Sequence, residues 1–348
     1  MVRRLFRIFG NLVILAAAFG LLARYVSPEI FWPPAIVALL LPGLLLYTLI
    51  ALVYRLLRRQ WLAVIFPLLV LLFALPTLQH LFAVPEAAPR GPALQPPTLR
   101  VLTANQRFFR NDNGKDADSV TVVQAFQKYD ADIALLQEVR SDRFQLNFMQ
   151  DIQRSGQLRQ QHQQDATFMA TYAASLTPVR ARFIPPNEYN GYLVTDVDTD
   201  LGKLRVINAH LQTNQISDMA RDMGREDQLS SRLGTLGSML TGYGRATRTR
   251  ATQAEELREA VEKSPYPVIL GGDFNDVPSS YTYNHILTPR LRDAWSVRGT
   301  GLGTTFTGPL PGLRIDFLLV DTSLTVVDIE RLPPLWSDHR PVLVTVGR

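Results

Sequence analysis

The sequence predicts an α/β domain built of layered sheets and helices, preceded by about three transmembrane helices. Three apolar stretches come first, and strand-like and helix-like segments alternate through the rest of the chain. Between these regions, Val84–Pro97 holds five prolines in 14 residues, a composition that predicts a semi-rigid spacer. We therefore expect a membrane region at residues 1–83, a linker at 84–98 and a second domain at 99–348.

Each apolar stretch is long enough to cross a bilayer, which takes about 20 residues. The stretches run over about Ile8–Val26, Ile30–Val53 and Trp61–Phe82, and the second has no charged side chain over its 24 residues. The first also has the basic start and apolar middle of a signal peptide, and a buried helical hairpin would be similarly apolar. Two further stretches and the lack of a clear cleavage site favour retained transmembrane helices.

Arginine placement predicts the orientation of these helices in a cytoplasmic membrane. Six arginines precede the first stretch or lie between the second and third, namely Arg3, Arg4, Arg7, Arg55, Arg58 and Arg59. The other flanks carry only Arg24 and Arg90. Because basic residues stay inside, three spans would place the second domain outside the cytoplasm. The lipid bilayer is then one partner of the protein, and the sequence points to no protein partner.

The net charge of +5 resides in the membrane region rather than in the second domain. Residues 1–98 carry eight basic and two acidic side chains, which leaves 28 basic and 29 acidic residues for the rest. A near-neutral domain lacks the bulk electrostatics of non-specific nucleic-acid binding, although Arg245, Arg248 and Arg250 could form a local patch. The chain has no cysteine, which excludes disulfides, thiol nucleophiles and thiolate metal sites.

Hydrophobic periodicity places the main elements of the second domain. We expect strands at Leu99–Asn105, Asp132–Gln137, Asn190–Val197, Leu204–His210, Pro267–Gly272, Arg314–Val320 and Pro341–Val346, and helices at Ser119–Tyr129 and Thr249–Lys263. Ser119 is the expected cap of the first helix. The glutamine-rich segment Gln157–Gln164 is expected to be a solvated loop or helix face.

Polar and acidic side chains recur where apolar strands end. They are Asn105, Glu138, His210, Asp273, Asn275, Asp316, Asp338 and His339. Alone, each is more simply a turn residue, a solvated carboxylate or a structural histidine. Rigid strands present catalytic groups at their ends, so the repetition predicts an active site. Asp316 lies within RIDFLLV and is costly to bury unless Arg314 or a histidine pairs with it.

Six motifs carry a family resemblance. In order they are LRVLTAN, DIALLQE, INAHLQ, GGDFND, RIDFLLV and SDHRPV. Together they resemble the endonuclease/exonuclease/phosphatase superfamily over nearly all of residues 99–346, and the stretch around GGDFNDVPSSYTYNHIL is similar to membrane-anchored bacterial members. The superfamily includes deoxyribonucleases, abasic-site endonucleases, neutral sphingomyelinases and inositol-polyphosphate 5-phosphatases. The resemblance implies a four-layer α/β sandwich, with two mixed sheets face to face and helices outside, that hydrolyses a phosphodiester or phosphomonoester.

The resemblance also implies a divalent metal, Mg²⁺ or Mn²⁺. Glu138 resembles the main metal ligand, since a hard carboxylate suits a hard cation. Asn105 is similar to the asparagine that supports metal or phosphate at the first strand, and Asp338 resembles a second metal-binding or water-orienting carboxylate. Such a cation neutralises phosphate charge and polarises the P–O bond.

Five further residues resemble the family's catalytic groups. Asp273 is similar to the residue that orients or deprotonates the attacking water, and Asn275 to the one that positions the phosphate. Asp316 and His339 resemble a carboxylate–imidazole pair, whose charged ring would stabilise phosphate oxygens in the transition state. His210 would contact the phosphate or the leaving group.

The sequence leaves the substrate open. Arg107 stands where many relatives have an acidic residue, and the stretch before Asn190 departs from the family's pattern. A lipid headgroup or soluble phosphoester therefore competes with extracytoplasmic nucleic acid as substrate. A catalytically silent binding protein of the same fold is the alternative class, but every core position of the motifs is filled. A transporter with an accessory domain is a third class. It is disfavoured because the chain has three expected spans and none of them contains an acidic residue.

Overall fold

The computed structural model describes residues 2–87, 97–111, 113–139, 146–163, 168–183, 189–213, 229–308 and 312–348. The chain forms two compact units, each discontinuous in sequence. The helical unit comprises Met1–Phe82, Asn214–Ala254 and Asp276–Ile286, and the sandwich unit comprises Ala83–Thr213, Glu255–Asn275 and Leu287–Arg348. Most of the expected linker, residues 88–96 with Arg90, lies outside the described residues.

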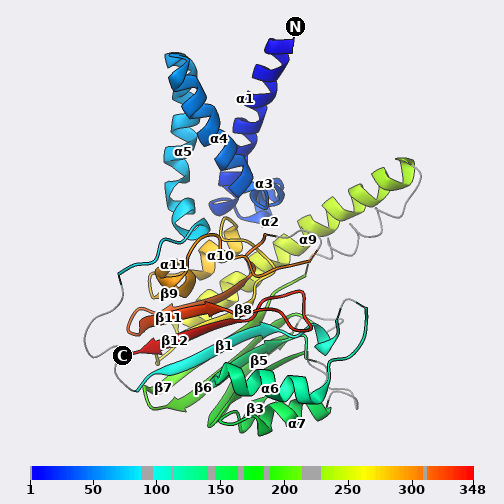
Figure 1. The fold of residues 1–348 in the computed structure, drawn as a ribbon, viewed down its shortest axis with the longest axis vertical. Helices are drawn as coiled ribbons and strands as arrows, with labels where there is room; N and C mark the ends of the chain where they lie inside the picture. Colours follow the sequence, from blue (N-terminus) through cyan, green and yellow to red (C-terminus); the bar gives the residue numbers. More distant parts are fainter. Residues whose placement is uncertain are drawn as a thin grey trace. The chain divides into compact units, whose positions relative to one another are not determined.

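Two six-stranded mixed sheets, packed together, form the sandwich unit, which confirms the predicted α/β class (Figure 1). The first sheet contains β1 (Leu99–Asn105), β2 (Ile133–Gln137), β3 (Gln160–His162), β4 (Met169–Ala173), β11 (Thr325–Arg331) and β12 (Val342–Gly347). The second contains β5 (Leu176–Phe183), β6 (Gly191–Thr199), β7 (Gly202–His210), β8 (Val268–Asp273), β9 (Leu291–Asp293) and β10 (Asp316–Asp321). The orders are β11-β12-β1-β2-β4-β3 and β5-β6-β7-β8-β10-β9.

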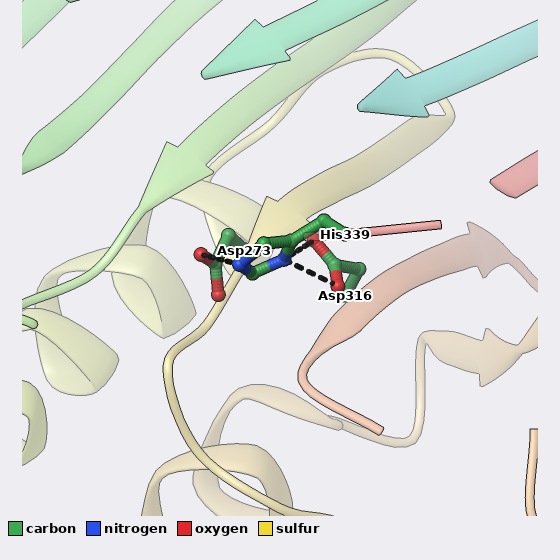
Figure 2. Close-up of side chains that lie close together, drawn as sticks. All are labelled: Asp273, Asp316 and His339. Carbon is green, nitrogen blue, oxygen red and sulfur yellow. Dashed lines mark hydrogen bonds and ion pairs between the residues drawn. The ribbon is translucent and has the colours of Figure 1, made fainter. Parts of the chain in front are cut away.

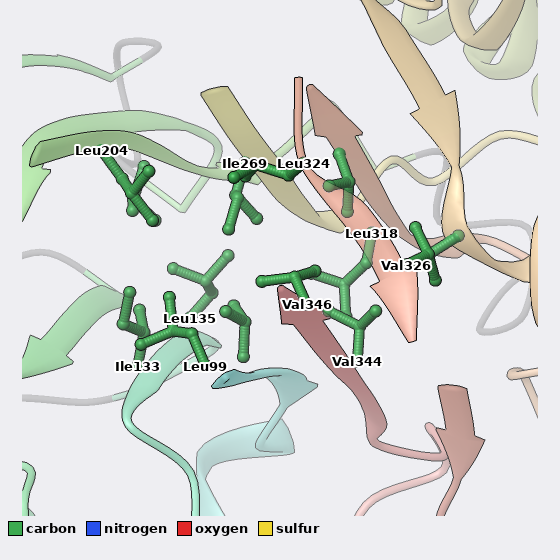
Figure 3. Close-up of a cluster of buried hydrophobic side chains, with 14 of the residues drawn as sticks. Leu99, Ile133, Leu135, Leu204, Ile269, Leu318, Leu324, Val326, Val344 and Val346 are labelled. Carbon is green, nitrogen blue, oxygen red and sulfur yellow. The ribbon is translucent and has the colours of Figure 1, made fainter. Parts of the chain in front are cut away.

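Side-chain alternation along the strands builds two apolar cores. Leu99 and Val101 of β1 join the cluster between the sheets, which Figure 3 shows. Leu102 and Ala104 point the other way and join a second cluster with residues of α6 (Ser119–Tyr129) and α7 (Leu146–Arg154). Because successive strand residues face opposite sides, this sheet is buried on both faces. The sites at its strand ends therefore stand on a rigid base.

Several expected elements change in detail. Asp118, rather than Ser119, caps α6, since its carboxylate accepts a hydrogen bond from the Thr121 N–H. The expectation of a solvated loop or helix face at Gln157–Gln164 is wrong for β3, where His162 is buried and its Nδ1 lies 2.8 Å from Thr195 Oγ1. Helix α9 (Leu229–Glu262) begins 20 residues before the expected Thr249.

The N-terminal region forms six short or long helices: α1 (Val2–Leu21), η1 (Leu22–Arg24), α2 (Pro28–Phe31), α3 (Pro33–Ala38), α4 (Leu41–Leu57) and α5 (Trp61–Leu81). Among the described residues, two stretches are long and apolar enough to cross a membrane, Arg7–Arg24 and Trp61–Leu81. The expectation of three transmembrane helices is not supported, because Ile30–Val53 is not one helix. Prolines at the first turns of α2, α3 and α4 start new helices and interrupt the old ones.

Within the helical unit, the segment between α1 and α4 contacts two other helices. Its α3 contacts α9, and its η1 contacts α10 (Tyr281–Ile286). The Tyr243 hydroxyl donates to the Ala35 carbonyl at 3.0 Å, and the Ser279 hydroxyl donates to the Ala38 carbonyl at 3.1 Å. The Trp32 ring covers Gly244, where an added Cβ would lie 2.7 Å from the ring. The absence of a side chain at Gly244 thus allows a close contact with α9.

We expect Gly244→Ala to destabilise the full-length protein and Gly237→Ala, on the same helix, to stabilise it. An added methyl at Gly237 meets nothing within 4 Å, so it should bring only the helical preference of alanine, about 1 kcal/mol. At Gly244 the same gain is opposed by overpacking against Trp32, which costs about 1–3 kcal/mol. Thermal unfolding in detergent measures the difference. Equal midpoints for the two variants would contradict the packing described here.

Candidate active site

The candidate site begins with two parallel strand pairs, one in each sheet. In the first sheet Asn105, the last residue of β1, lies opposite Gln137, so Glu138 follows at the same edge. In the second sheet His210 of β7 lies opposite Asp273 of β8. Since parallel strands end at one edge, each pair presents its polar residues together.

Asn105 joins the two sheets at this edge. Its Nδ2 atom donates hydrogen bonds to Glu138 Oε1 at 3.0 Å and to Asp273 Oδ2 at 3.1 Å. Its Oδ1 atom accepts the backbone N–H of Arg107 at 2.9 Å. With both ends of the amide engaged in this way, Asn105 bridges the carboxylates of Glu138 and Asp273, and its expected role in supporting metal or phosphate stays a prediction.

The imidazole of His339 lies between Asp316 and Asp273 (Figure 2). Asp316 begins β10 directly opposite Asp273 on the antiparallel strand β8. His339 Nδ1 lies 3.1 and 3.0 Å from the two Asp316 oxygens, and His339 Nε2 lies 3.8 Å from Asp273 Oδ2. The buried partner that the sequence required for Asp316 is thus a histidine, while Arg314 pairs with Asp293 at 2.7 Å.

Burial and charge set the protonation states of these groups. Burial opposes the charged form of His339, but the Asp316 and Asp273 carboxylates and the hydrogen bond to Asp316 outweigh it and raise its pKa to about 10. Burial raises the pKa of Asp273 to about 6. At neutral pH the site therefore holds a charged imidazolium ring between Asp316 and Asp273, with Nε2 on the side of Asp273.

His210 is in the opposite state. It is buried, and burial lowers its pKa, so its ring is neutral at pH 7. Its Nε2 atom lies 3.8 Å from both Glu138 Oε1 and Asp273 Oδ2 and makes no hydrogen bond within the described part of the chain. A buried polar atom without a partner is costly unless a ligand supplies one.

Asn275 and Asp338 complete the expected set. The backbone N–H of Asn275 donates to Asp273 Oδ1 at 2.8 Å, and its Nδ2 donates to the Leu211 carbonyl at 3.0 Å. Asp338 Oδ1 lies 3.7 Å from Arg107 Nε. Arg107, which stands where many relatives are acidic, therefore faces a carboxylate of the site.

Backbone strain is concentrated at the same strand ends. Of the seven non-glycine residues with positive φ in the described chain, five lie here: Arg107, Phe108, Phe109, Glu138 and Asn275. Left-handed conformations cost about 1–2 kcal/mol per residue and persist where the surrounding structure enforces them. The site is therefore built on conformations that the core maintains.

Three supporting residues were not foreseen. Gln137 Nε2 donates to Asn208 Oδ1 across the two sheets at 2.7 Å, one layer behind the site. Thr305 Oγ1 accepts the backbone N–H of Asp316 at 3.1 Å. For Gln137 and Asn208 the available signal was a polar residue inside an apolar strand, in DIALLQE and VINAH. The same signal identified Asp316.

The residues present fit a divalent cation. Burial raises the pKa of Glu138, although the hydrogen bond from Asn105 and the charge of His339 lower it. Glu138 and Asp338 offer carboxylate oxygens, the ligands that a hard cation prefers. Asp273, Asp316 and His339 also lie close enough together to share a cation.

Two regions of the chain match known protein families. Residues 102–339 match the family described as Endonuclease/Exonuclease/phosphatase family. The chain belongs to this family. Its members are hydrolases of phosphate esters and generally depend on a divalent metal. Residues 3–81 match a family described only as a domain of unknown function (DUF8431). No curated protein matches the chain.

Solved structures of the endonuclease/exonuclease/phosphatase family are similar to this chain. A member from Beutenbergia cavernae is 17% identical with a TM-score of 0.49, over 72% of this chain and 71% of that one. A Bacteroides vulgatus member is 18% identical with a TM-score of 0.48, over 72% and 99%. D. rerio TDP2, solved with a single-strand DNA product, is 14% identical with a TM-score of 0.49, over 73% and 100%.

We expect Asp316→Asn to lower the pKa of His339 from about 10 by more than a unit, because it removes the nearer of two charges that favour the protonated ring. Histidine ring NMR over pH 5–11 measures the change. With the native pair, its contribution to the free energy of unfolding should be complete below about pH 6.5 and lost as the pH rises through about 10. The exposed Asp328→Asn is the control, and an unchanged His339 titration in Asp316→Asn would refute the pairing.

Proposed function

We propose that the chain is a membrane-anchored, Mg²⁺- or Mn²⁺-dependent hydrolase that cleaves a phosphodiester or phosphomonoester outside the cytoplasm. The observation that carries the proposal is the charged His339 ring held between Asp316 and Asp273, next to the carboxylate of Glu138. This arrangement supplies a fixed cation for phosphate oxygens and a carboxylate for water. Family membership makes a phosphate ester the substrate class.

The site residues divide the hydrolysis between them. Asp273 orients the attacking water and accepts its proton, which its raised pKa of about 6 favours near neutral pH. The new water-to-phosphorus bond forms as the ester P–O bond breaks. The leaving oxygen takes a proton from solvent water, and Asp273 afterwards returns the proton that it accepted to solvent. His339 donates Nε2–H to a non-bridging oxygen, where negative charge develops. Asp316 holds the ring in place and keeps it charged.

The remaining residues bind the phosphate and the metal. Glu138, with Asp338, would hold the cation, and Asn105 keeps Glu138 aligned with Asp273. When bound, the cation neutralises phosphate charge and polarises the P–O bond. In the tautomer that carries its proton on Nε2, the neutral His210 ring would donate Nε2–H to a phosphate or leaving-group oxygen. Asn275, oriented by its contact with the Leu211 carbonyl, would position the phosphate.

The membrane part of the proposal rests on the helical unit. Two of its helices have the length and composition of membrane spans, and α4 is a shorter apolar helix of 17 residues. Leucine, isoleucine and phenylalanine side chains are exposed along these helices, including Leu62 at 87% and Leu46 at 59%. Such surfaces are costly in water and are stabilised in a bilayer.

We expect Glu138→Gln to reduce hydrolysis of a chromogenic phosphodiester by about 100-fold or more without unfolding the protein. The amide keeps the shape of the side chain but removes the charge that would hold the cation, whose stabilisation is worth several kcal/mol. The test uses full-length protein in detergent with Mg²⁺ or Mn²⁺, with and without chelator. Glu330→Gln, an exposed residue of β11, is the control. Full activity of Glu138→Gln, or of wild type in excess chelator, would exclude the metal assignment.

We also expect a reporter that works only outside the cytoplasm to be active when fused after residue 98 and inactive when fused near Arg58. The prediction requires the shorter helix α4 to cross the membrane between α1 and α5. The arginines at the start of the chain and around Arg58 favour the cytoplasmic side for both of these segments. Reporter activity in cells, normalised to fusion-protein level, measures the result. The reverse pattern would place the sandwich unit in the cytoplasm.

A further inference from the structure

Three aromatic side chains of the sandwich unit form a cluster that the catalytic proposal does not use. The rings of Phe168 and Tyr189 are stacked, with centroids 4.1 Å apart and planes at 27°. Phe108 stands nearly perpendicular to both, with ring planes at 86° to Phe168 and 76° to Tyr189 and centroids 5.7 and 6.4 Å away. Tyr189 is 40% exposed, and Phe108 and Phe168 are half-buried. Large aromatic rings left partly open to solvent are typical of binding surfaces.

Backbone contacts fix this aromatic cluster beside the candidate active site. The Phe108 N–H donates to the Glu138 carbonyl at 2.8 Å, and the Val139 N–H donates to the Phe168 carbonyl at 2.8 Å. Tyr189 precedes Asn190, whose side chain donates to the carbonyl of Leu211, the residue after His210, at 2.9 Å. The backbone segment that carries each ring is therefore bonded to a residue next to Glu138 or His210. These bonds hold the aromatic cluster beside the candidate active site.

The geometry of the cluster distinguishes between two kinds of ligand. A quaternary ammonium group, as in a choline headgroup, binds where several ring faces converge around it. Here two ring faces are already stacked on each other, and the third ring stands nearly perpendicular to both, so the three faces do not converge on one point. A stacked pair is instead extended by another flat ring at its open face, a contact that is worth about 1–3 kcal/mol for a nucleobase.

We propose that Phe108, Phe168 and Tyr189 form a subsite for a flat aromatic group of the substrate, with Tyr189 as the accessible ring. The inference rests on the proposed function and narrows its substrate class to phosphate esters that carry a nucleobase-like ring. The near-neutral charge of residues 99–348 favours a small ester of this type over a long nucleic acid, whose binding needs many basic contacts.

The test compares three esters that release ethanol, so the leaving group is held constant and carries no aromatic ring. They are the ethyl esters of thymidine 5′-phosphate, methyl phosphate and phosphocholine, assayed by coupled detection of ethanol with full-length protein in detergent. We expect wild type to prefer the thymidine ester. Tyr189→Ala should raise KM for that ester about tenfold, within the range for loss of one stacked ring, and leave kcat and the methyl ester unchanged. Tyr189→Phe should retain wild-type KM because it keeps the ring.

Tyr266→Ala is the matched control, since Tyr266 precedes β8 at the opposite end from Asp273 and contacts Lys203 and Arg205 through its ring. Calorimetric binding of thymidine 5′-monophosphate gives a readout independent of turnover, and it should weaken in Tyr189→Ala but not in Tyr266→Ala. Preference for the phosphocholine ester, or an equal effect of Tyr189→Ala on all three esters, would overturn the subsite. Absence of hydrolysis by wild type with intact, Tyr189-dependent nucleotide binding would instead overturn the proposed function alone.

Discussion

The candidate active site depends on one group, the side-chain amide of Asn105. Its nitrogen donates to Glu138 at the edge of the first sheet and to Asp273 at the edge of the second. The buried carboxylate of Asp273 and the half-buried carboxylate of Glu138 repel each other, and a shared donor offsets part of that repulsion. The contact exists only while both parallel strand pairs keep their registers, because a shift of one residue would turn each side chain to the opposite face.

Much of the fold and of the candidate site could be predicted from sequence because buried strands have a recognisable apolar pattern and the site residues lie at their ends. Apolar runs that end in a polar residue gave β1, β2, β7 and β8 and, with them, Asn105, Glu138, His210 and Asp273. Strand β5 gave no such signal because most of its residues are exposed. The first part of α9 was missed because Gly234, Gly237 and Gly244 lower its helical preference.

Other features depend on tertiary contacts that no local pattern encodes. The apolar run that ends at Asn105 indicated a polar residue at a strand end. The direction of its amide follows from the two carboxylates around it. Similarly, Arg107 departed from the family's pattern, and only its 3.7 Å approach to Asp338 shows what it faces. The aromatic cluster joins residues 81 positions apart in sequence, from Phe108 to Tyr189, through loops without periodicity.

The proline-rich segment predicts a linker at residues 84–98, and the chain passes between the helical unit and the sandwich unit five times. The crossings follow Phe82, Thr213, Ala254, Asn275 and Ile286. One of them comes directly after Asn275 in the GDFND motif, where Asp276 accepts a hydrogen bond from the buried Arg250 at 3.2 Å within the helical unit. Neighbouring residues of one motif therefore belong to both units. A simple tether at residues 84–98 would leave the motif unaffected by the helices, but this connectivity makes the position of the residue after Asn275 depend on α9.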